Sequence, residues 1–123
     1  MKFLITKKFE FEAAHRLPNH PGKCKKLHGH TYRLEVTIST KQLNLQDMVM
    51  DFGDLKAIVN SHIIEIFDHS YLNELLPNPT AEELARYIYL DLSVFIAEAE
   101  KGRVKVEKIR LYETSNSYAE VVE

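Results

Sequence analysis

Polar and apolar residues alternate near the beginning of the chain. Between Phe3 and His15 the odd-numbered positions are mostly apolar, whereas the even-numbered positions from Thr6 to Glu12 are polar or charged. A repeat of two residues is typical of a β-strand with one buried face. The pattern therefore predicts a strand over residues 3–15, with His15 on its apolar face. Taken alone, a histidine in such a place is more often a hydrogen-bonded core residue than a metal ligand.

A second alternating segment begins at His28. Its even-numbered positions start as histidines and become apolar further along: His28, His30, Tyr32, Leu34, Val36 and Ile38. If this strand pairs antiparallel with the first, His28 and His30 lie beside His15. Gly29 between them favours close approach of a ligand or another backbone, because glycine weakens the interior of a strand. The segment 17–26 is rich in Pro, Gly, Asn and Lys, which predicts a loop that carries Cys24.

The middle of the chain has the spacing of two amphipathic helices. After a loop over residues 41–46, a first helix is predicted with Asp51 or Asp54 as its cap and with one apolar stripe, formed by Leu55, Ile58, Val59, Ile63, Ile66 and Phe67. A second helix begins at Thr80, which is spaced from Glu83 as in a capping box, and it ends at Gly102. Its predicted buried face consists of Leu84, Ile88, Leu92, Phe95 and Ala99.

The last part of the chain returns to alternation. The phase of the apolar positions changes between Val106 and Ile109, which predicts a strand with a bulge near Glu107 or Lys108. Glu113 shares the inward phase of Ile109. A carboxylate on an inward face is costly without a partner, so Glu113 is either exposed by fraying of the strand end or available for a ligand. A turn over 114–117 and a short strand over 118–122 complete the chain.

The order of elements is strand, strand, helix, helix, strand, strand. This order predicts an α+β fold in which a four-stranded antiparallel sheet carries two helices on one face. The length of 123 residues fits a single domain spanning 1–123. An open sheet of four strands leaves two exposed edges, and such edges favour association with other chains. Self-association is therefore expected.

Composition and charge exclude several classes of partner. With 16 basic and 18 acidic residues the net charge is −2, so no positive field exists to hold a polyanion, and nucleic acid is not expected as a direct partner. The single cysteine rules out an intramolecular disulfide. No apolar run is long enough to span a membrane, and Lys7 and Lys8 interrupt the first apolar segment before a signal peptide could form. These features predict a cytoplasmic protein.

The segment from Cys24 to His30 is the strongest candidate for chemistry, because it offers one thiol and two imidazoles within seven residues. With His15 as a third ligand and an open fourth position, the set is typical of a catalytic zinc site. Asp68 and His69 follow the first helix, where they either terminate it or form an acid/base pair. His62 has no spaced partner and is predicted to be structural.

Several motifs in one order along the chain resemble the 6-pyruvoyl-tetrahydropterin synthase family, and within it the 6-carboxytetrahydropterin synthases of queuosine biosynthesis. The short spacing between Cys24 and His28 is similar to that of the carboxy enzymes. The matching segments cover nearly the whole chain: Glu12–His15, Cys24–His30, Val49–Lys56, Asp68–His69, Asn78–Glu82 and Tyr112–Thr114.

The resemblance implies a tunnelling fold (T-fold), in which subunit sheets join into a barrel and two trimers stack as a homohexamer with active sites between subunits. It implies a zinc-dependent lyase that converts 7,8-dihydroneopterin triphosphate to 6-carboxytetrahydropterin, with release of triphosphate and acetaldehyde. Three alternatives stay open. They are a pyruvoyl synthase that keeps the three-carbon side chain, a non-catalytic zinc-binding module of the same fold, and a zinc hydrolase.

The resemblance also implies a role for each candidate residue. Zinc would be held by His15, His28 and His30. Cys24 would act as the base, with its thiolate favoured by the zinc and by Lys23, Lys25 and Lys26. Asp68 and His69 would form a second acid/base relay, donated by a neighbouring subunit. Glu113 would bind the amino-pyrimidinone edge of the pterin through its carboxylate. Thr80 and Glu82 would line the pterin pocket.

Overall fold

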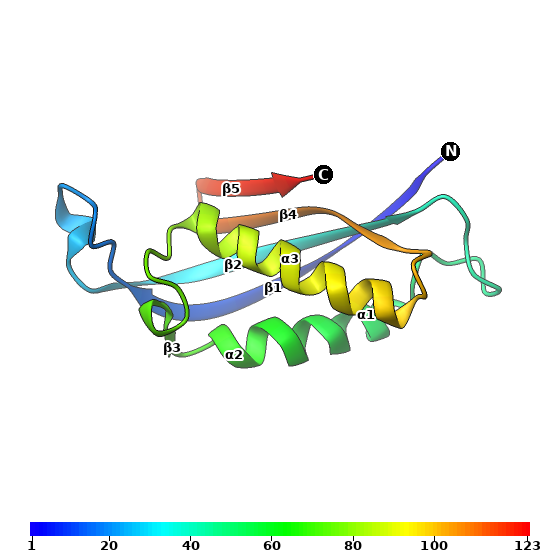
Figure 1. The fold of residues 1–123 in the computed structure, drawn as a ribbon, viewed down its shortest axis with the longest axis horizontal. Helices are drawn as coiled ribbons and strands as arrows, with labels where there is room; N and C mark the ends of the chain where they lie inside the picture. The colour runs from blue at the N-terminus through cyan, green and yellow to red at the C-terminus, as the bar shows by residue number, and fades with distance from the viewer.

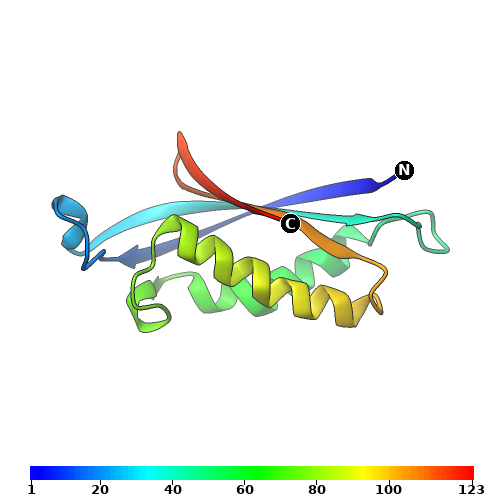
Figure 2. The ribbon, with the colours of Figure 1, turned by 45° about the horizontal axis from the view of Figure 1, so that its top comes forward.

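The computed structural model describes residues 1–123 and shows a curved sheet with all of its helices on one face (Figures 1 and 2). The strand order is β3-β1-β2-β4-β5. The strands are β1 Phe3–His15, β2 His28–Thr40, β3 Ser70–Tyr71, β4 Lys105–Thr114 and β5 Ser117–Val122. The longer helical segments are α1 Phe52–Val59, a π-helical turn Asn60–Ile64, α2 Glu65–Phe67 and α3 Ala81–Ala99. The predicted α+β class is confirmed. No helix in the structure is both long and apolar enough to cross a membrane.

The two alternating segments at the start of the chain pair as predicted. β1 and β2 run antiparallel, with His15 opposite His28 and Ala13 opposite His30. The apolar face of both strands meets the helices, and the core includes Phe11 and Tyr32, whose stacked rings lie 5.0 Å apart. The register between the two strands follows from the alternation itself, because a shift of one residue would turn every apolar side chain to solvent.

The sheet has five strands, so the predicted count of four is wrong by one. The additional strand, β3, contains only two residues and runs parallel to β1, with Ser70 opposite Ala13 and Tyr71 opposite Ala14. A strand of two residues is too short to show a repeat in the sequence. It pairs with the sheet because the chain leaves α2 directly beside the end of β1.

The first helical stretch is continuous from Phe52 to Phe67 and contains a π turn. Its fully buried side chains are spaced by four residues: Leu55, Val59, Ile63 and Phe67. Residues four apart drift around an α-helix, which has 3.6 residues per turn, and the wider π turn offsets that drift. Ile66 was predicted to lie on the stripe, but it is 42% exposed. Asp51 caps the helix and accepts hydrogen bonds from the amides of Gly53 and Asp54.

Helix α3 begins as predicted and buries a slightly different face. The Thr80 hydroxyl accepts a hydrogen bond from the Glu83 amide. Ile96 is buried, whereas Phe95 is only half-buried and stacks on His62 with 3.5 Å between ring centroids. Ala99 is exposed. The buried positions again follow a spacing of four, which places Ile96 rather than Phe95 or Ala99 over the sheet. His62 has the structural role that was predicted.

Gly102 closes the helix. Its amide donates to the Ala97 carbonyl at 2.9 Å, and its φ is +82°, a conformation that glycine adopts without strain.

The predicted bulge in β4 is present. Thr37 lies opposite Lys108 while Ile38 lies opposite Val106, so Glu107 is the extra residue. The bulge returns Ile109 and Leu111 to the core side.

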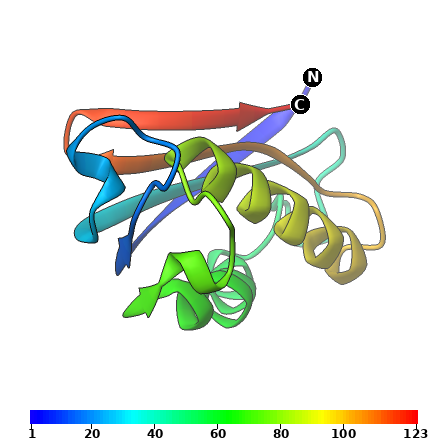
Figure 3. The same ribbon diagram turned by 60° about the vertical axis from the view of Figure 1, so that its left-hand side comes forward.

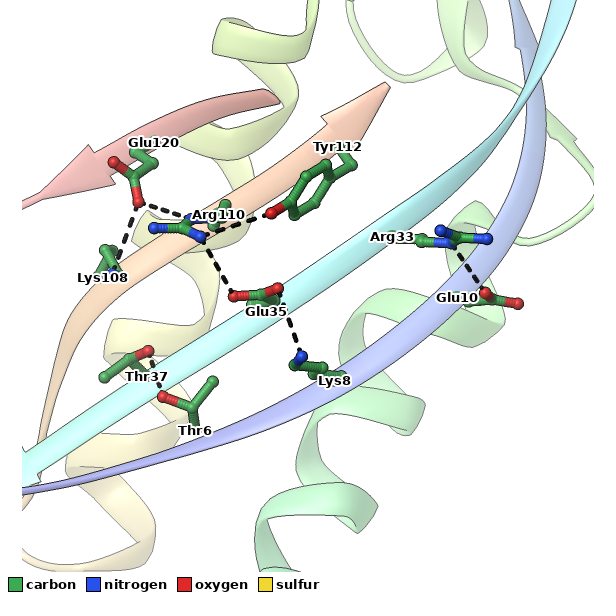
Figure 4. A network of polar contacts seen from close by, with 10 residues as sticks. All are labelled: Thr6, Lys8, Glu10, Arg33, Glu35, Thr37, Lys108, Arg110, Tyr112 and Glu120. Atoms are coloured by element: carbon green, nitrogen blue, oxygen red, sulfur yellow. Dashed lines mark hydrogen bonds and ion pairs between the residues drawn. The ribbon is translucent and has the colours of Figure 1, made fainter. Parts of the chain in front are cut away.

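The face of the sheet that carries no helix is polar. Figure 4 shows a network across β1, β2, β4 and β5 in which Arg110 contacts Glu35 and Glu120. The Arg110 guanidinium also lies over the Tyr118 ring, 4.4 Å from its centroid. Arg33 pairs with Glu10 on the same face at 3.1 Å. Exposed ion pairs of this kind add little stability. The composition of this face shows that it is built to contact water rather than an apolar layer.

Candidate metal centre and adjoining cleft

Three imidazoles converge where β1 ends and β2 begins. His15, His28 and His30, here called the histidine triad, have ring centroids 4.5, 4.8 and 5.0 Å apart in pairs. One nitrogen of each ring lies within 4.8 Å of the others, a geometry that could hold a metal ion. The β1–β2 register produces this cluster, because it places all three side chains on the helix-covered face of neighbouring strands.

Backbone carbonyls orient two of the rings. His15 Nδ1 donates to the Pro79 carbonyl at 2.8 Å, and His28 Nδ1 donates to the Lys26 carbonyl at 2.8 Å. A carbonyl can only accept, so each Nδ1 carries a proton, and Nε2 is the nitrogen that each ring has left for a metal. The two Nε2 atoms lie 3.0 Å apart. This arrangement is typical of metal-binding histidines, whose other nitrogen donates to a carbonyl or carboxylate.

Burial favours the neutral form of two of the three rings. Burial lowers the pKa of His15 and of His30 below its ordinary value, and the nearby Glu113 carboxylate only partly opposes this effect. A neutral imidazole is the form that binds a metal. His30 Nε2 is buried and has no hydrogen-bond partner. A buried nitrogen without a partner is costly, and a metal ion held by the triad would satisfy it.

Glu113 lies at the end of β4 and faces the triad. Its two carboxylate oxygens are 3.8 Å from His15 Nε2 and 3.9 Å from His30 Nε2. These distances permit electrostatic attraction but are longer than a hydrogen bond. The carboxylate accepts no hydrogen bond elsewhere in the chain, so both oxygens are available to a ligand.

A cleft of about 300 Å³ adjoins Glu113 and gathers four of the predicted site residues, Cys24, Thr80, Glu82 and Glu113. Three separate parts of the chain form its walls: the loop between β1 and β2, the start of α3, and the β4–β5 hairpin. Figure 3 shows these parts together at one end of the molecule. The other lining residues are Leu17, His20, Ala81, Ser117, Tyr118 and Ala119.

The lysines beside Cys24 do not line this cleft. Lys23, Lys25 and Lys26 are exposed, whereas Cys24 is partly buried among the lining residues. The three lysines that were expected to favour the thiolate of Cys24 are therefore not among the residues that form the cleft walls. Cys24 sits on a short helical turn, Lys23–Lys25.

Asp68 and His69 lie outside the cleft. Asp68 Oδ2 is 3.1 Å from His69 Nδ1, and Asp68 Oδ1 accepts a hydrogen bond from the Glu12 amide at 2.9 Å. That amide is the main cause that lowers the pKa of Asp68, and His69 adds to it. His69 has a φ of +58° and its side chain is 78% exposed. It borders a second hollow, here called the outer hollow, together with Glu12, Ala13, Ala14, Gly29, His30, Thr31 and Ser70.

Three residues at the site were not found from the sequence. Pro79 orients His15 through its carbonyl, and the hydroxyl of the buried Tyr32 lies 3.3 Å from the same nitrogen. Tyr32 continues the alternation of His28 and His30, so its inward direction was visible in the sequence. His20 lines the cleft from an irregular loop, where no periodic signal exists.

Comparisons with known proteins agree with this geometry. A family model described as 6-pyruvoyl tetrahydropterin synthase matches residues 4–123. A 6-carboxy-5,6,7,8-tetrahydropterin synthase from Synechocystis is 38% identical and covers 95% of this chain and 91% of its own length. A Haemophilus influenzae protein of the same name is also 38% identical and covers 98% and 99%.

Solved structures share the fold. The 6-pyruvoyl tetrahydropterin synthase of Caenorhabditis elegans superposes with a TM-score of 0.85 at 22% identity, over 100% of this chain and 96% of that one. At this identity the likeness concerns the fold alone, and the fold is the T-fold expected from the sequence.

Proposed function

The chain belongs to the 6-pyruvoyl tetrahydropterin synthase family, and on that premise we propose that it is a zinc-dependent 6-carboxy-5,6,7,8-tetrahydropterin synthase. In this proposal the protein is a lyase of queuosine biosynthesis. Its substrates are 7,8-dihydroneopterin triphosphate and water, and its products are 6-carboxytetrahydropterin, triphosphate and acetaldehyde. The observation that carries the proposal is the convergence of three imidazoles beside a cleft that holds both the single thiol and Glu113.

The residues of the triad fit zinc. Three imidazole nitrogens with no fourth protein donor match a catalytic zinc site, which keeps one position open. The unpartnered Nε2 of His30 and the fixed Nδ1 protons of His15 and His28 support this assignment. Bound zinc would supply Lewis-acid stabilisation of negative charge on the side-chain oxygens of the substrate.

Cys24 is the proposed base. In its thiolate form it takes a proton from a substrate carbon next to a polarised oxygen, and triphosphate then leaves. Cys24 is partly buried and lines the cleft, so a substrate in the cleft would lie next to this residue. As the only cysteine in the chain, it has no competing thiol.

Glu113 is the proposed anchor for the pterin. The amino-pyrimidinone edge offers two parallel N–H donors, and a carboxylate accepts such a pair in a two-pronged geometry. Both oxygens of Glu113 are free of hydrogen bonds, and the side chain is 28% exposed toward the cleft. Thr80 and Glu82 line the same cleft and would contact the ring, although the Thr80 hydroxyl is already engaged as the cap of α3.

Asp68 and His69 are proposed to act in the site of a neighbouring subunit. Within one chain they border the outer hollow and not the cleft. The Asp68 carboxylate orients the imidazole, and the exposed ring of His69 is then free to donate or accept a proton in another chain.

The sheet edges support a homohexamer made of two trimers. β5 has no strand on its outer side, and β3 covers β1 only at Ala13 and Ala14. Exposed edges of this length favour pairing with another chain. In a closed barrel of such sheets, the polar network of Figure 4 would face a water-filled interior. Native mass spectrometry should then record six copies of the chain, and a monomer at working concentration would contradict this assembly.

Product analysis tests the proposed reaction. Incubation of zinc-loaded protein with 7,8-dihydroneopterin triphosphate should release acetaldehyde and triphosphate in equal amounts, together with the mass of 6-carboxytetrahydropterin. Triphosphate release with retention of the three-carbon side chain would instead identify a pyruvoyl synthase. Absence of turnover despite bound zinc would favour a non-catalytic module.

A Cys24→Ala variant separates the metal from the base. We expect it to keep its zinc and to lose about 100- to 10,000-fold in turnover, the usual contribution of a positioned acid/base group. Unchanged turnover would remove Cys24 from the reaction.

A further inference from the structure

Asp68 and His69 lie in a short turn between α2 and β3, here called the 67–70 turn, which is anchored at both ends. Phe67, the last residue of α2, is fully buried in the core. Ser70 begins β3 and lies opposite Ala13 of β1. The two residues of the proposed acid/base pair are therefore carried by a segment whose ends are fixed to the core and to the sheet.

The backbone of His69 adopts a conformation that neighbouring contacts must enforce. Its φ is +58°, in the left-handed region that residues with a side chain rarely adopt. Such a conformation persists only where the surrounding structure holds it. The His69 amide donates to the Glu12 carbonyl, and the Glu12 amide donates to Asp68 Oδ1 at 2.9 Å. Glu12 therefore holds the turn through its backbone, which a change of its side chain would leave in place.

Ser70 adds a side-chain hydrogen bond that closes the turn on itself. Its hydroxyl donates to the Phe67 carbonyl at 2.6 Å, so this bond spans Asp68 and His69. The Phe67 carbonyl lies at the C-terminal end of α2, where carbonyls lack partners within the helix. A hydrogen bond across so short a segment restricts the backbone angles of both residues inside it. It thereby restricts the direction in which the His69 ring leaves the turn.

We propose that Ser70 is a positioning residue for His69, which it holds beside the outer hollow by closing the 67–70 turn. This inference rests on the proposed role of Asp68 and His69 as an acid/base pair. Both Ser70 and His69 line the outer hollow. Without the Ser70 hydroxyl, only the contacts with Glu12 would oppose relaxation of the left-handed backbone. Because a displacement of about 1 Å at a reacting group can cost roughly 100-fold in rate, partial loosening of the turn should lower turnover.

Amide hydrogen exchange tests the inference without turnover. Ser70→Ala removes the hydroxyl, so the turn should open more often, and the His69 amide should exchange about two- to ten-fold faster, the effect of losing one hydrogen bond. Mass analysis of peptides that cover residues 66–72 measures this rate. Ser70→Thr keeps a hydroxyl on the same carbon and should exchange at close to the original rate.

Ser93→Ala is the matched control. Like Ser70, Ser93 is partly buried, and its hydroxyl donates to a main-chain carbonyl, that of Tyr89, at 2.6 Å. This bond lies within α3, so its loss should leave exchange in the 67–70 turn unchanged. The inference is overturned if Ser70→Ala exchanges as slowly as the unaltered protein, or if Ser93→Ala accelerates exchange in the turn equally.

Turnover shows whether Ser70 acts through His69. If the proposed reaction is correct, Ser70→Ala should lower kcat about two- to ten-fold while KM and zinc content stay unchanged, and Ser70→Thr should restore kcat. In a His69→Gln background, Ser70→Ala should cause no further loss, because the group that it positions is already absent. An equal further loss in that background would show that Ser70 acts on something other than His69, and would overturn the inference.

The two measurements separate this inference from the proposed function. Faster exchange in Ser70→Ala, in a protein that does not convert 7,8-dihydroneopterin triphosphate, would contradict the proposed function and leave the hold of Ser70 on His69 standing. Normal turnover of the unaltered protein, with exchange and kcat unchanged in Ser70→Ala, would do the reverse.

Discussion

The histidine triad and the Asp68–His69 pair both adjoin β1, but they differ in burial and in the contacts of their rings. His15 is fully buried and His69 is 78% exposed. The triad rings are fixed by carbonyls and face one another across the β1–β2 register. The pair is fixed only at its backbone and carboxylate, where Asp68 Oδ1 and the His69 amide bond to Glu12 at 2.9 and 2.5 Å.

This difference teaches which part of the site one chain can complete alone. All three potential metal ligands come from neighbouring strands, so the metal centre requires no other subunit. The imidazole of His69 contacts no residue of the cleft, although its position is held by Asp68 and by an unusual φ. Non-glycine residues held at positive φ cluster at functional sites, and this agrees with the role proposed for His69 in a neighbouring subunit.

Loss of a triad member should have the largest effect. We expect His30→Ala to lose zinc and at least roughly 1,000-fold in turnover, because Lewis-acid stabilisation is worth several kcal/mol. Metal analysis by mass spectrometry and a turnover assay measure both. His69→Gln is the matched comparison and should keep its zinc. Equal zinc loss in the two variants would contradict the assignment of metal binding to the triad and not to His69.

Loss of the exposed pair should have a smaller effect that another chain can repair. We expect His69→Gln to lower turnover roughly 100-fold with zinc retained. Mixed oligomers of His69→Gln and Cys24→Ala should regain about a quarter of the original activity, because random assembly places an intact Cys24 next to an intact His69 in that share of sites. Mixed oligomers as inactive as their parents would show that both groups serve the same chain.

The smallest expected effect is on the free energy of unfolding, which should change with pH differently for the histidine triad and for Asp68. Burial lowers the pKa of His15 and His30 from the ordinary 6.5, so below pH 6.5 the unfolded chain takes up protons that the folded chain resists. Their contribution to stability is complete above that value and is lost as the pH falls through the folded pKa values. The pKa of Asp68 is lowered from 3.8, so Asp68 stabilises the folded state fully above pH 3.8. This stabilisation is lost only in more acidic solution, as the pH falls through the folded pKa.

Urea unfolding of metal-free protein at pH 7, 6 and 5 measures this effect. The midpoint should fall across the series, and the fall should be shallower in His30→Ala, which lacks one of the two groups. A midpoint that does not change between pH 7 and 5 would contradict the assigned environment of the triad.

The regular parts of this molecule could be predicted from its sequence because their signals are periodic. The alternation from Phe3 to His15 and from His28 onward fixed the strands, their shared face and therefore the meeting of the triad. The change of phase near Glu107 located the bulge, and the spacing from Thr80 to Glu83 located the start of α3.

The remainder depends on tertiary context. The sequence does not reveal the π turn at Asn60–Ile64, so Ile66 was assigned too much burial. In α3 the buried positions keep a spacing of four residues, so Ile96 and not Phe95 is buried. Proximity in the sequence suggested that Lys23, Lys25 and Lys26 support Cys24; none of the three lines the cleft, and His20, which was not singled out from the sequence, does. The adjacent Asp68 and His69 were recognised as a pair, and only the coordinates show that they face away from the cleft.

Zinc titration of metal-free protein tests the central claim most directly. With 7,8-dihydroneopterin triphosphate in excess, we expect acetaldehyde formation to rise in proportion to added zinc and to stop rising at one equivalent per chain, with no response in His30→Ala. Acetaldehyde formation that is independent of zinc, or a full response in His30→Ala, would contradict the assignment of the triad as the catalytic metal centre.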